Sequence, residues 1–475
     1  MSYRDLRGWI DEVDRLGEVK RFRRADWNLE VGALCTLVSP TENCPTLLFD
    51  ELKGYPAGYR ILVNPLASLN RIALTSRLPL NLSKREYVSL WKKKLKELVP
   101  IEPTVVENGP VMENVQTGGD VDVLAFPSPF WHAGDGGRYI GTATAIITRD
   151  PDDGWVNFGT YRTEVIDRNH VVPFIAFGKH GLIHRDKYLK RGKPCPVAVS
   201  VGHDPLIFMA ASLEAPYGVN EYRYAGGIKA EPVEVIRGPL TGLPIPARAE
   251  IVLEGEFIPG QTFAEGPFGE WTGYYGSSSR NEPVIEVKAV YHRNDPIILA
   301  NFHEKAVNAP TIHQNIIRSG IIHQELERAG VPDVAGVWCH EAGGPRFLIA
   351  VSIKQRYPGH ARQAAQVATF CHGGAHMGRY VIVVDDDIDV GNLDEVMWAV
   401  CSRTDPEKSI EIFKRCWGSE IDPVIPFKEK GLSSRAIIDA CRPWEWRDDF
   451  PAVAAVSEEL KATTRAKWGA ELDWP

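Results

Sequence analysis

The sequence predicts an α+β protein in which a strand-rich middle segment is joined by one long helix to a C-terminal α/β segment. Short apolar runs separated by turn residues fill residues 106–305, and this pattern is typical of an antiparallel barrel or sandwich. A helical pattern then continues through "PTIHQNIIRSGIIHQELERA", residues 310–329. Beyond it, predicted strands and helices alternate, which indicates parallel strands with a right-handed crossover.

Residues 1–105 have a mixed α/β pattern. Apolar residues recur at helical spacing in "DLRGWIDEVDRLG", and Gly17 suits the end of that helix. "PTLLFDEL" and "RILVNPL" follow as predicted short strands. The sequence therefore divides into an α/β segment packed on the barrel (1–105), a strand-rich domain (106–308), a connecting helix (309–330) and a C-terminal α/β domain (331–475).

The predicted strands of the middle segment include "YIGTATAIIT", "VVPFIAF", "PVAVSVG", "AEIVLEGEFI", "VIEVKAVYH" and "PIILAN". In the C-terminal segment, "RFLIAVSI" and "YVIVVDD" are predicted strands, and "ARQAAQVATF" and "LDEVMWAVCSR" are predicted helices. The last residues place Trp444, Trp446, Trp468 and Trp474 among charged residues. We interpret them as a docking tail.

Composition narrows the classes of partner and location. The 475 residues allow two or three domains of ~100–200 residues each. The net charge of −8 argues against nucleic acid as the main partner, because such binding depends on clustered Lys and Arg. The charged N-terminus lacks the apolar run of a signal peptide, and no stretch approaches the ~20 apolar residues of a membrane span. Eight cysteines without a CxxC suit a reducing compartment, so we expect a cytoplasmic protein without a membrane partner.

Several polar residues interrupt the apolar patterns of the middle segment. "NFGTYR" places Asn157 and Arg162 in what looks like one buried strand, His180 follows a strand in "AFGKHG", and Glu221 lies in the Gly- and Tyr-rich loop "APYGVNEYRYAGG". Asn157, His180 and Glu221 offer a carbonyl oxygen, an imidazole nitrogen and a carboxylate. This set suits Mn²⁺ or Mg²⁺ better than structural zinc, and a phosphate could complete the shell because only one ligand is negative.

A second set combines Arg162 with Glu265 and Glu270 of "FAEGPFGEWTGYYG". When two carboxylates share one guanidinium, one is held ionised and the pKa of the other rises. A Glu with a raised pKa can deliver a proton near neutral pH. The residue types are equally compatible with a structural salt-bridge network between domains.

The order of these motifs resembles the UbiD-type decarboxylases, which use prenylated flavin mononucleotide (prenylated FMN). The resemblance rests on N-x4-R, a His after "GK", "NEY" and "EGPFGEWTGYY", and it extends to "VIVVDDDID…WAVCSRTDP". It therefore covers nearly the whole chain. It implies a split β-barrel flavin-binding domain joined by a long helix to a C-terminal α/β oligomerisation domain, in a homodimer or homohexamer.

The resemblance also implies roles for individual residues. Asn157, His180 and Glu221 match ligands of a divalent ion that holds the flavin phosphate, and Arg162, Glu265 and Glu270 match the catalytic network. Ser212 and Leu213 match a segment around the phosphate and a potassium ion, while Phe174 and Trp271 line the substrate pocket. The implied cofactor-binding residues are Asn157, Thr160, Tyr161, Arg162, Lys179, His180, Ser212, Leu213, Glu221 and Arg379, with Lys354 as the rival of Arg379 at the phosphate.

The function implied is the reversible, non-oxidative decarboxylation of an aromatic, heteroaromatic or α,β-unsaturated carboxylic acid. Charge left on carbon when CO₂ departs requires an electron-sink cofactor, which a flavin prenyltransferase would supply. Arg162 would orient the carboxylate, Glu270 would protonate the carbon, and Glu265 would hold Arg162. The alternatives are a split-barrel flavin oxidoreductase and a non-catalytic, flavin-binding assembly subunit. The sequence does not select the acid, the physiological direction or the oligomer.

Overall fold

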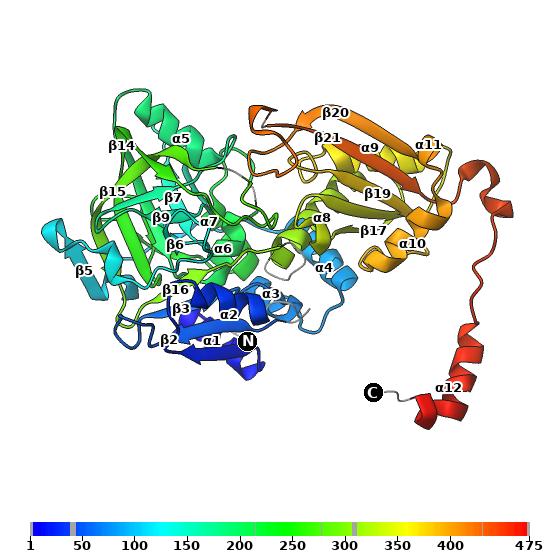
Figure 1. Ribbon diagram of the computed structural model, residues 1–475, viewed down its shortest axis with the longest axis horizontal. Helices are drawn as coiled ribbons and strands as arrows, with labels where there is room; N and C mark the ends of the chain where they lie inside the picture. Colours follow the sequence, from blue (N-terminus) through cyan, green and yellow to red (C-terminus); the bar gives the residue numbers. More distant parts are fainter. Residues whose placement is uncertain are drawn as a thin grey trace.

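The largest sheet of the protein has nine strands and contains most of the strand-rich middle segment (Figure 1). The structure, a computed structural model, describes residues 3–38, 44–213, 215–276, 278–305, 311–429 and 431–472. The sheet runs in the order β6-β9-β10-β15-β14-β11-β7-β8, and β5 pairs with β15. Its end strands are β6 and β8, so an open, half-barrel sheet fits this order. The strands are β5 (Asn114–Thr117), β6 (Arg138–Gly141), β7 (Ala145–Arg149), β8 (Val156–Gly159), β9 (Thr163–Val165), β10 (His170–Pro173), β11 (Cys195–Val201), β14 (Ile251–Glu265) and β15 (Arg280–His292).

Three helices pack near this sheet; two begin at predicted site residues and one, α6, ends just before Ser212. They are α5 (His180–Leu189), α6 (Pro205–Ala211) and α7 (Glu221–Lys229). Helix α5 contacts β7, β8, β11 and β14, so it covers one face of that half of the sheet. A small sheet beside it consists of β4 (Thr104–Val105), β12 (Glu234–Arg237) and β13 (Pro244–Pro246).

The N-terminal segment forms a separate four-stranded sheet that takes its last strand from the middle of the chain. Its strands are β1 (Val19–Arg23), β2 (Thr46–Asp50), β3 (Arg60–Val63) and β16 (Ile297–Ala300), with helices α1 (Leu6–Arg15), α2 (Glu30–Val38), α3 (Leu69–Ser76) and α4 (Lys84–Glu97). The sequence pattern assigned "PIILAN" to the middle segment, but β16 pairs in parallel with β3. All of β16 is buried, and a short apolar run does not indicate which sheet will include it.

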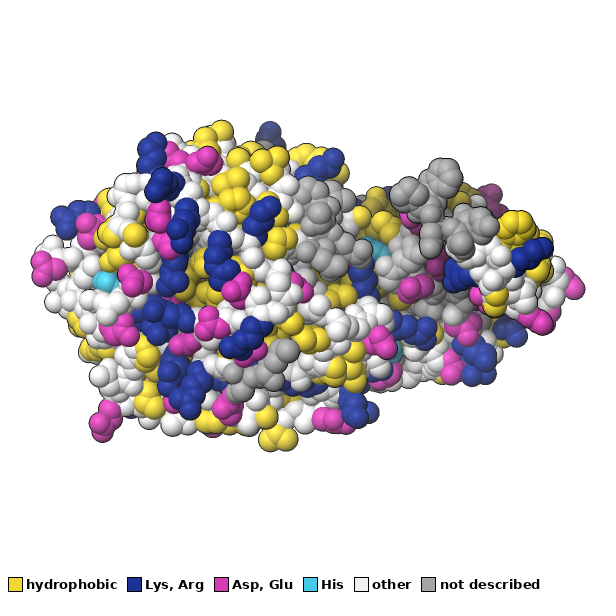
Figure 2. Space-filling view, turned by 90° about the horizontal axis from the view of Figure 1, so that it is seen from below, with side chains coloured by type: hydrophobic (Ala, Val, Ile, Leu, Met, Phe, Trp, Pro, Cys, Tyr) yellow, Lys and Arg dark blue, Asp and Glu magenta, His cyan; other side chains and the backbone are white. Residues whose placement is uncertain are grey.

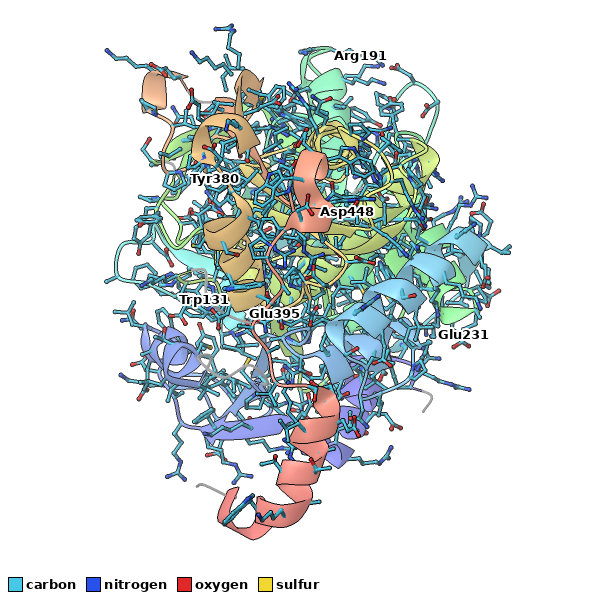
Figure 3. All side chains as sticks on the ribbon, turned by 90° about the vertical axis from the view of Figure 1, so that its right-hand side faces the viewer. Trp131, Arg191, Glu231, Tyr380, Glu395 and Asp448 are labelled. Atoms are coloured by element: carbon cyan, nitrogen blue, oxygen red, sulfur yellow. The ribbon has the colours of Figure 1, made fainter. Side chains whose placement is uncertain are left out.

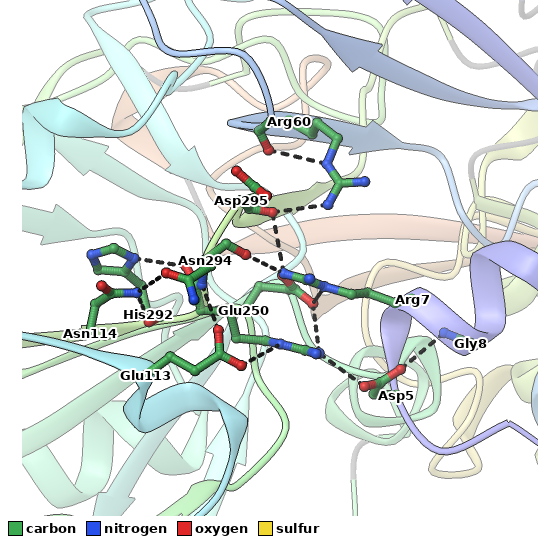
Figure 4. A network of polar contacts seen from close by, with 12 residues as sticks. Asp5, Arg7, Gly8, Arg60, Glu113, Asn114, Glu250, His292, Asn294 and Asp295 are labelled. Atoms are coloured by element: carbon green, nitrogen blue, oxygen red, sulfur yellow. Dashed lines mark hydrogen bonds and ion pairs between the residues drawn. The ribbon is translucent and has the colours of Figure 1, made fainter.

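A polar network joins helix α1 to the nine-stranded sheet (Figure 4). Arg7 donates to both oxygens of Glu250, at 3.0 and 2.8 Å, and also to the carbonyl of Asn294 at 2.7 Å. Arg293 donates to Glu250 at 3.2 Å and to Asp5, just before α1, at 2.9 Å. Because the Glu250 side chain is fully buried, these cations balance a charge that would otherwise be costly.

The C-terminal segment is a five-stranded sheet in the order β17-β18-β19-β21-β20. Strand β18, helix α9 and strand β19 form a βαβ unit with parallel strands, as the alternating pattern predicted. Helix α8 precedes the sheet and occupies most of the predicted 309–330 range, of which 309 and 310 lie outside the described residues. The elements are α8 (Ile312–Arg328), β17 (Val334–Cys339), β18 (Leu348–Ile353), α9 (His360–Phe370), β19 (Tyr380–Asp385), α10 (Leu393–Arg403), α11 (Pro406–Ser409), β20 (Ile410–Trp417) and β21 (Leu432–Ala440).

The end of the chain leaves the body as an arm. A short 3-10 helix (Trp444–Asp449) leads through an extended stretch to α12 (Glu458–Leu472). Helix α12 lies clear of the sheets in Figure 1, and in Figure 3, seen from that side, it is drawn in front of the N-terminal segment. Trp446 and Trp468 are about half exposed on it, and Trp474 lies outside the described residues. The tail is therefore not part of the core.

One apolar core runs through all three segments. It includes Trp9 and Trp91 of the N-terminal segment, Phe208 of α6, Ile316 of α8 and Ile382 of β19. On the face shown in Figure 2, positive and negative side chains lie interspersed. Within the described part of the chain, no helix combines the length and apolar character needed to cross a membrane.

Candidate active site

A cavity of about 330 Å³ lies between the nine-stranded sheet and the C-terminal segment. Its walls come from β8 and the turn after it, the start of α5, the end of α6, the loop after β14, and residues of α8 and the C-terminal loops. Most of the sequence-predicted site residues line it. These are Asn157, Thr160, Tyr161, Arg162, Phe174, Lys179, His180, Ser212, Glu221, Glu270 and Trp271.

Strand β8 and the turn that follows it hold the two polar residues of "NFGTYR". Asn157 lies within β8, but the strand ends at Gly159, so Arg162 lies in the turn before β9. This corrects the expectation that one strand carries both residues. The turn is fixed by Thr144, whose hydroxyl donates to the Tyr161 carbonyl at 2.7 Å. Gly159 leaves room for the Tyr161 ring, which a Cβ there would overlap.

The predicted ion-binding residues come from β8 and from the first residues of two helices. His180 begins α5, and Glu221 begins α7 rather than lying in a loop, with Asn220 capping the helix by accepting from Tyr222 N at 3.0 Å. Glu221 Oε2 accepts from the backbone N–H of Phe158 at 2.9 Å, next to Asn157. The His180 ring packs on Trp155, with 5.0 Å between ring centroids. The fold therefore brings all three residues to one wall of the cavity.

The chemistry of this group fits a divalent ion with an anion beside it. Burial raises the pKa of Glu221 to about 8, so its ionised form requires a cation nearby. Asn157 Nδ2 is buried and has no hydrogen-bond partner among the described residues. A phosphate oxygen would satisfy that donor while the Asn157 carbonyl oxygen binds the ion. The described residues contain no group of three or more His, Cys, Asp or Glu placed to hold a metal.

The second predicted set is assembled around the Arg162 guanidinium. Arg162 Nε and Nη2 donate to Glu265 at 2.7 and 2.9 Å, and Nη1 contacts Glu270. The three side chains are at most 9% exposed. Burial, together with the charges of Glu265 and Asp135, raises the pKa of Glu270 against the opposing effect of Arg162. Although burial opposes it, Glu270 and Glu265 raise the pKa of Arg162 above its usual value. The arrangement provides one fixed cation and one carboxyl group whose pKa lies above its usual value.

Aromatic rings surround this guanidinium. Its carbon lies 4.2 Å from the ring centroid of Phe174 and 5.0 Å from that of Phe268. Phe174 is positioned by the backbone, because its N–H donates to the Arg162 carbonyl at 3.1 Å. Trp271 follows Glu270 and packs on Phe347 of the C-terminal segment, 5.0 Å between centroids. The reactive groups thus face a space with flat apolar walls.

The loop between Glu265 and Glu270 is held at both ends by carboxyl groups that the sequence pattern did not single out. Glu164 Oε2 accepts from Gly266 N at 3.0 Å, and Asp135 Oδ1 accepts from Gly269 N at 2.9 Å. Gly136 N donates to the Pro267 carbonyl at 2.7 Å. Glu164 could have been noticed as a charged residue in the short buried strand "TEV". Asp135 lies in a loop and gave no such signal.

Three predicted residues lie away from the cavity lining. Glu265 lies behind Arg162, and Leu213 is buried in the main apolar core. Arg379 is ion-paired with Asp422, at 2.6 and 2.5 Å to its two oxygens, and stacks on Phe347. Its rival Lys354 does not line the cavity either.

The cations that do line the cavity are Lys179, Arg318 and Arg346, besides Arg162. Lys179 was predicted, but Arg318 and Arg346 were not. Arg318 lies in the middle of α8, is 6% exposed and donates to the Gly373 carbonyl at 2.6 Å. Its position within the predicted helix, residues 310–329, gave no indication that it faces a site.

Comparison with known proteins gives a consistent result over the length of the chain. Three family models match: the 3-octaprenyl-4-hydroxybenzoate carboxy-lyase N-terminal domain (residues 10–80), its Rift-related domain (104–305) and its C-terminal domain (312–440). A phenolic acid decarboxylase of Streptomyces sp. (strain D7) is 32% identical over 99% of this chain and 98% of its own. A pyrrole-2-carboxylic acid decarboxylase of Pseudomonas aeruginosa is 32% identical over 95% of this chain and 94% of its own.

Solved structures agree with this comparison. The vanillic acid decarboxylase of Sedimentibacter hydroxybenzoicus, in closed form, has a TM-score of 0.86 at 27% identity, covering 98% of this chain and 99% of that one. The UbiD-class enzyme HmfF of Pelotomaculum thermopropionicum, in complex with FMN, has a TM-score of 0.86 at 27% identity, covering 98% and 100%. An evolved dimeric form of HmfF, in complex with prenylated FMN, has a TM-score of 0.83 at 27% identity and the same coverage.

Proposed function

Because the chain belongs to the 3-octaprenyl-4-hydroxybenzoate carboxy-lyase (UbiD) family, we propose that it catalyses the reversible, non-oxidative decarboxylation of a carboxylic acid. The acid is aromatic, heteroaromatic or α,β-unsaturated. The observation that carries the proposal is the buried Arg162, which contacts Glu265 and Glu270 at an aromatic-walled cavity. Replacing CO₂ by a proton requires a cation for the substrate carboxylate and an acid beside the carbon, and this arrangement supplies both.

The cofactor in this proposal is prenylated FMN, as in one structural relative. Asn157, His180 and Glu221 would hold Mn²⁺ or Mg²⁺ at its phosphate, and the segment at Ser212 and Leu213 would hold K⁺. When bound, the modified flavin supplies the electron sink for the charge left on carbon. The support from this chain is the donor set of oxygen, nitrogen and oxygen at one wall, with the buried Asn157 amide beside it.

The side chains around Arg162 have distinct tasks in this reaction. Contacts with Glu265 and Glu270 use three of the five guanidinium N–H groups, so two can bind the substrate carboxylate. Glu265 fixes the plane of Arg162 through its two hydrogen bonds. Glu270 retains a proton because burial raises its pKa, and it donates this proton to the carbon that loses CO₂. Phe174 and Trp271 exclude water and favour a flat ring.

A screen for released CO₂ tests the proposal. The enzyme is co-produced with a flavin prenyltransferase and incubated with phenolic, vanillic, 3,4-dihydroxybenzoic and pyrrole-2-carboxylic acids. Release from at least one acid is expected, and the same protein from cells without the prenyltransferase should be inactive. Flavin reduction by NAD(P)H without CO₂ release would favour an oxidoreductase. Bound prenylated FMN without any turnover would favour an assembly subunit.

The active form in this proposal is a homodimer or homohexamer in the cytoplasm. The arm that ends in α12 supports assembly, because Trp446, Val453, Val456, Leu460 and Trp468 are each about half exposed on it. Light scattering on the purified protein, with and without residues 443–475, measures the oligomer and the contribution of the arm.

A further inference from the structure

Tyr139 lies between two buried carboxyl groups, those of Glu265 and Glu164. Its hydroxyl oxygen is 3.1 Å from Glu265 Oε1 and 3.3 Å from Glu164 Oε2. The contact with Glu164 follows from the fold, because Tyr139 of β6 and Glu164 of β9 are directly opposite in the antiparallel ladder. Glu164 is 3% exposed and Glu265 is 1% exposed.

The single hydroxyl proton of Tyr139 decides which of the two carboxyl groups can accept a hydrogen bond from it. A tyrosine hydroxyl has one proton, so it can donate to only one of the two carboxyl groups. Glu265 is the stronger acceptor, because it is the group ion-paired with Arg162 and lies closer to the hydroxyl. Two ionised carboxyl groups would therefore compete for this one proton, whereas a neutral Glu164, whose Oε2 also accepts from Gly266 N at 3.0 Å, leaves it to Glu265.

We propose that Glu164 is a protonated positioning residue that sets the charge of the Arg162–Glu265–Glu270 network through Tyr139. In its neutral form it leaves the Tyr139 proton for Glu265, which stays paired with Arg162. When Glu164 ionises, it competes for that proton and adds a negative charge beside Glu265. The ion pair between Glu265 and Arg162 then weakens, and the rate of decarboxylation falls.

The surroundings of Glu164 agree with this assignment. The titratable and charged groups that face it are Tyr139 of β6, Arg162 of the preceding turn and Glu265 at the end of β14. Burial, with the charge of Glu265, raises the pKa of Glu164 to about 7, against the lowering effects of Gly266 N–H, Tyr139 and Arg162. Burial also raises the pKa of Tyr139, so its hydroxyl keeps its proton. Glu164 therefore changes charge near neutral pH.

The inference rests on the proposed function for its consequence in catalysis, but its chemical basis can be tested on the flavin-free protein. Infrared spectra of wild type and Glu164→Gln are recorded over a range of pH, and the spectrum of the variant is subtracted from that of wild type. The difference should show the band of a protonated carboxyl group, which disappears with a midpoint near pH 7. Glu282→Gln is the matched control, because Glu282 is also a buried carboxyl but is paired with Arg185 and Arg280. Absence of a carboxyl band above pH 6 in the Glu164 difference spectrum would overturn the assignment, whether or not the protein is a decarboxylase.

A second variant tests the link to Tyr139. Tyr139→Phe removes the hydroxyl without adding charge, and it should raise the midpoint of the Glu164 band because the hydroxyl favours the ionised form. A midpoint unchanged in this variant would show that the two groups do not interact, which would overturn the proposed route to Glu265.

The consequence for catalysis appears in the pH profile of the flavin-loaded enzyme. Gln keeps the size and neutrality of a protonated Glu and an oxygen for Gly266 N–H. Glu164→Gln should therefore stay within about tenfold of wild type at pH 6, well short of the ~10²–10⁴-fold cost of losing a general acid. Wild-type kcat/KM should fall as the pH rises through 7, and the fall should move to higher pH in Glu164→Gln but not in Glu282→Gln. An unchanged profile in Glu164→Gln would contradict the proposal.

Discussion

Arg162 donates to both oxygens of Glu265, from Nε at 2.7 Å and from Nη2 at 2.9 Å. Because of this two-point pairing, Glu265 and Glu270 differ in how they contact Arg162. Glu265 accepts a parallel pair of charge-assisted bonds, the stronger kind of contact with a guanidinium. Glu270 contacts only Nη1, and burial raises its pKa. The geometry thus gives the two carboxyl groups different tasks: Glu265 fixes Arg162 in place, and Glu270 is the group with the raised pKa.

Glu270→Gln should abolish most turnover, because the amide keeps the shape of the side chain but has no carboxylic proton to give. The expected loss is ~10²–10⁴-fold in kcat, with flavin and metal still bound. Exchange of the ring or α-proton of the product with D₂O measures the protonation step alone and should fall in parallel. Glu265→Gln should be milder, since it weakens the hold on Arg162 without removing the donor.

Glu256→Gln is a suitable control for both variants, because Glu256 lies on the same strand as Glu265 and pairs with Lys288 away from the cavity. It should leave exchange unchanged. Near-normal exchange in Glu270→Gln together with lost exchange in Glu265→Gln would mean that the two roles are reversed.

His180→Ala should lose the divalent ion and most of the flavin together. The ion would be bound between the protein and the cofactor phosphate, and without it Glu221 and the phosphate repel each other. Metal analysis and flavin absorbance of the purified variant provide the measurement. His170→Ala is the control, because His170 begins β10 and pairs with Asp167 outside the cavity. Full flavin occupancy in a metal-free His180 variant would refute the ion assignment.

The stability of the flavin-free, metal-free protein should fall as the pH rises. Burial raises the pKa of Glu221 from its usual 4.5 to about 8. Between these values the folded protein binds a proton that the unfolded chain has lost, so unfolding becomes easier with increasing pH. The effect is complete above pH 8 and amounts to at most a few kcal/mol, at about 1.4 kcal/mol for each pKa unit.

Thermal unfolding of wild type and Glu221→Gln from pH 5 to pH 9 measures this effect. The variant should gain stability relative to wild type as the pH rises, and Mn²⁺ should stabilise wild type above pH 8 but not the variant. Glu97→Gln, on the exposed face of α4, should follow wild type throughout. A constant difference between wild type and Glu221→Gln would mean that Glu221 is not protonated in the folded apoprotein.

The sequence was sufficient to find the residues of the site that belong to continuous motifs. Asn157, His180, Glu221 and Glu270 lie in short polar stretches, and the structure places all four on one cavity. Strand and helix patterns likewise identified the βαβ unit β18-α9-β19, because each element has a complete apolar period.

What could not be predicted depends on pairing between distant residues. Tyr139 has the pattern of an ordinary buried strand residue, and only the order of strands brings its hydroxyl to Glu265 and Glu164. The family resemblance implied that Arg379 lies near the cofactor phosphate. The sequence did not indicate its ion pair with Asp422, 43 positions further along in a loop that has no periodic pattern.

Gly136→Ala should reduce activity without unfolding the protein. A Cβ at this position would overlap the carbonyl group of Gly266, and Gly136 N already donates to the Pro267 carbonyl at 2.7 Å. The substitution must therefore displace the loop that separates Glu265 from Glu270. Because a shift of about 1 Å in a catalytic group can cost up to ~10²-fold, we expect a loss of this order in kcat with flavin content retained. Gly119→Ala is the matched control, since a Cβ there meets no atom within 4 Å. If Gly136→Ala were as active as Gly119→Ala, the close packing of Gly136 on the loop would not be what positions the two carboxylates.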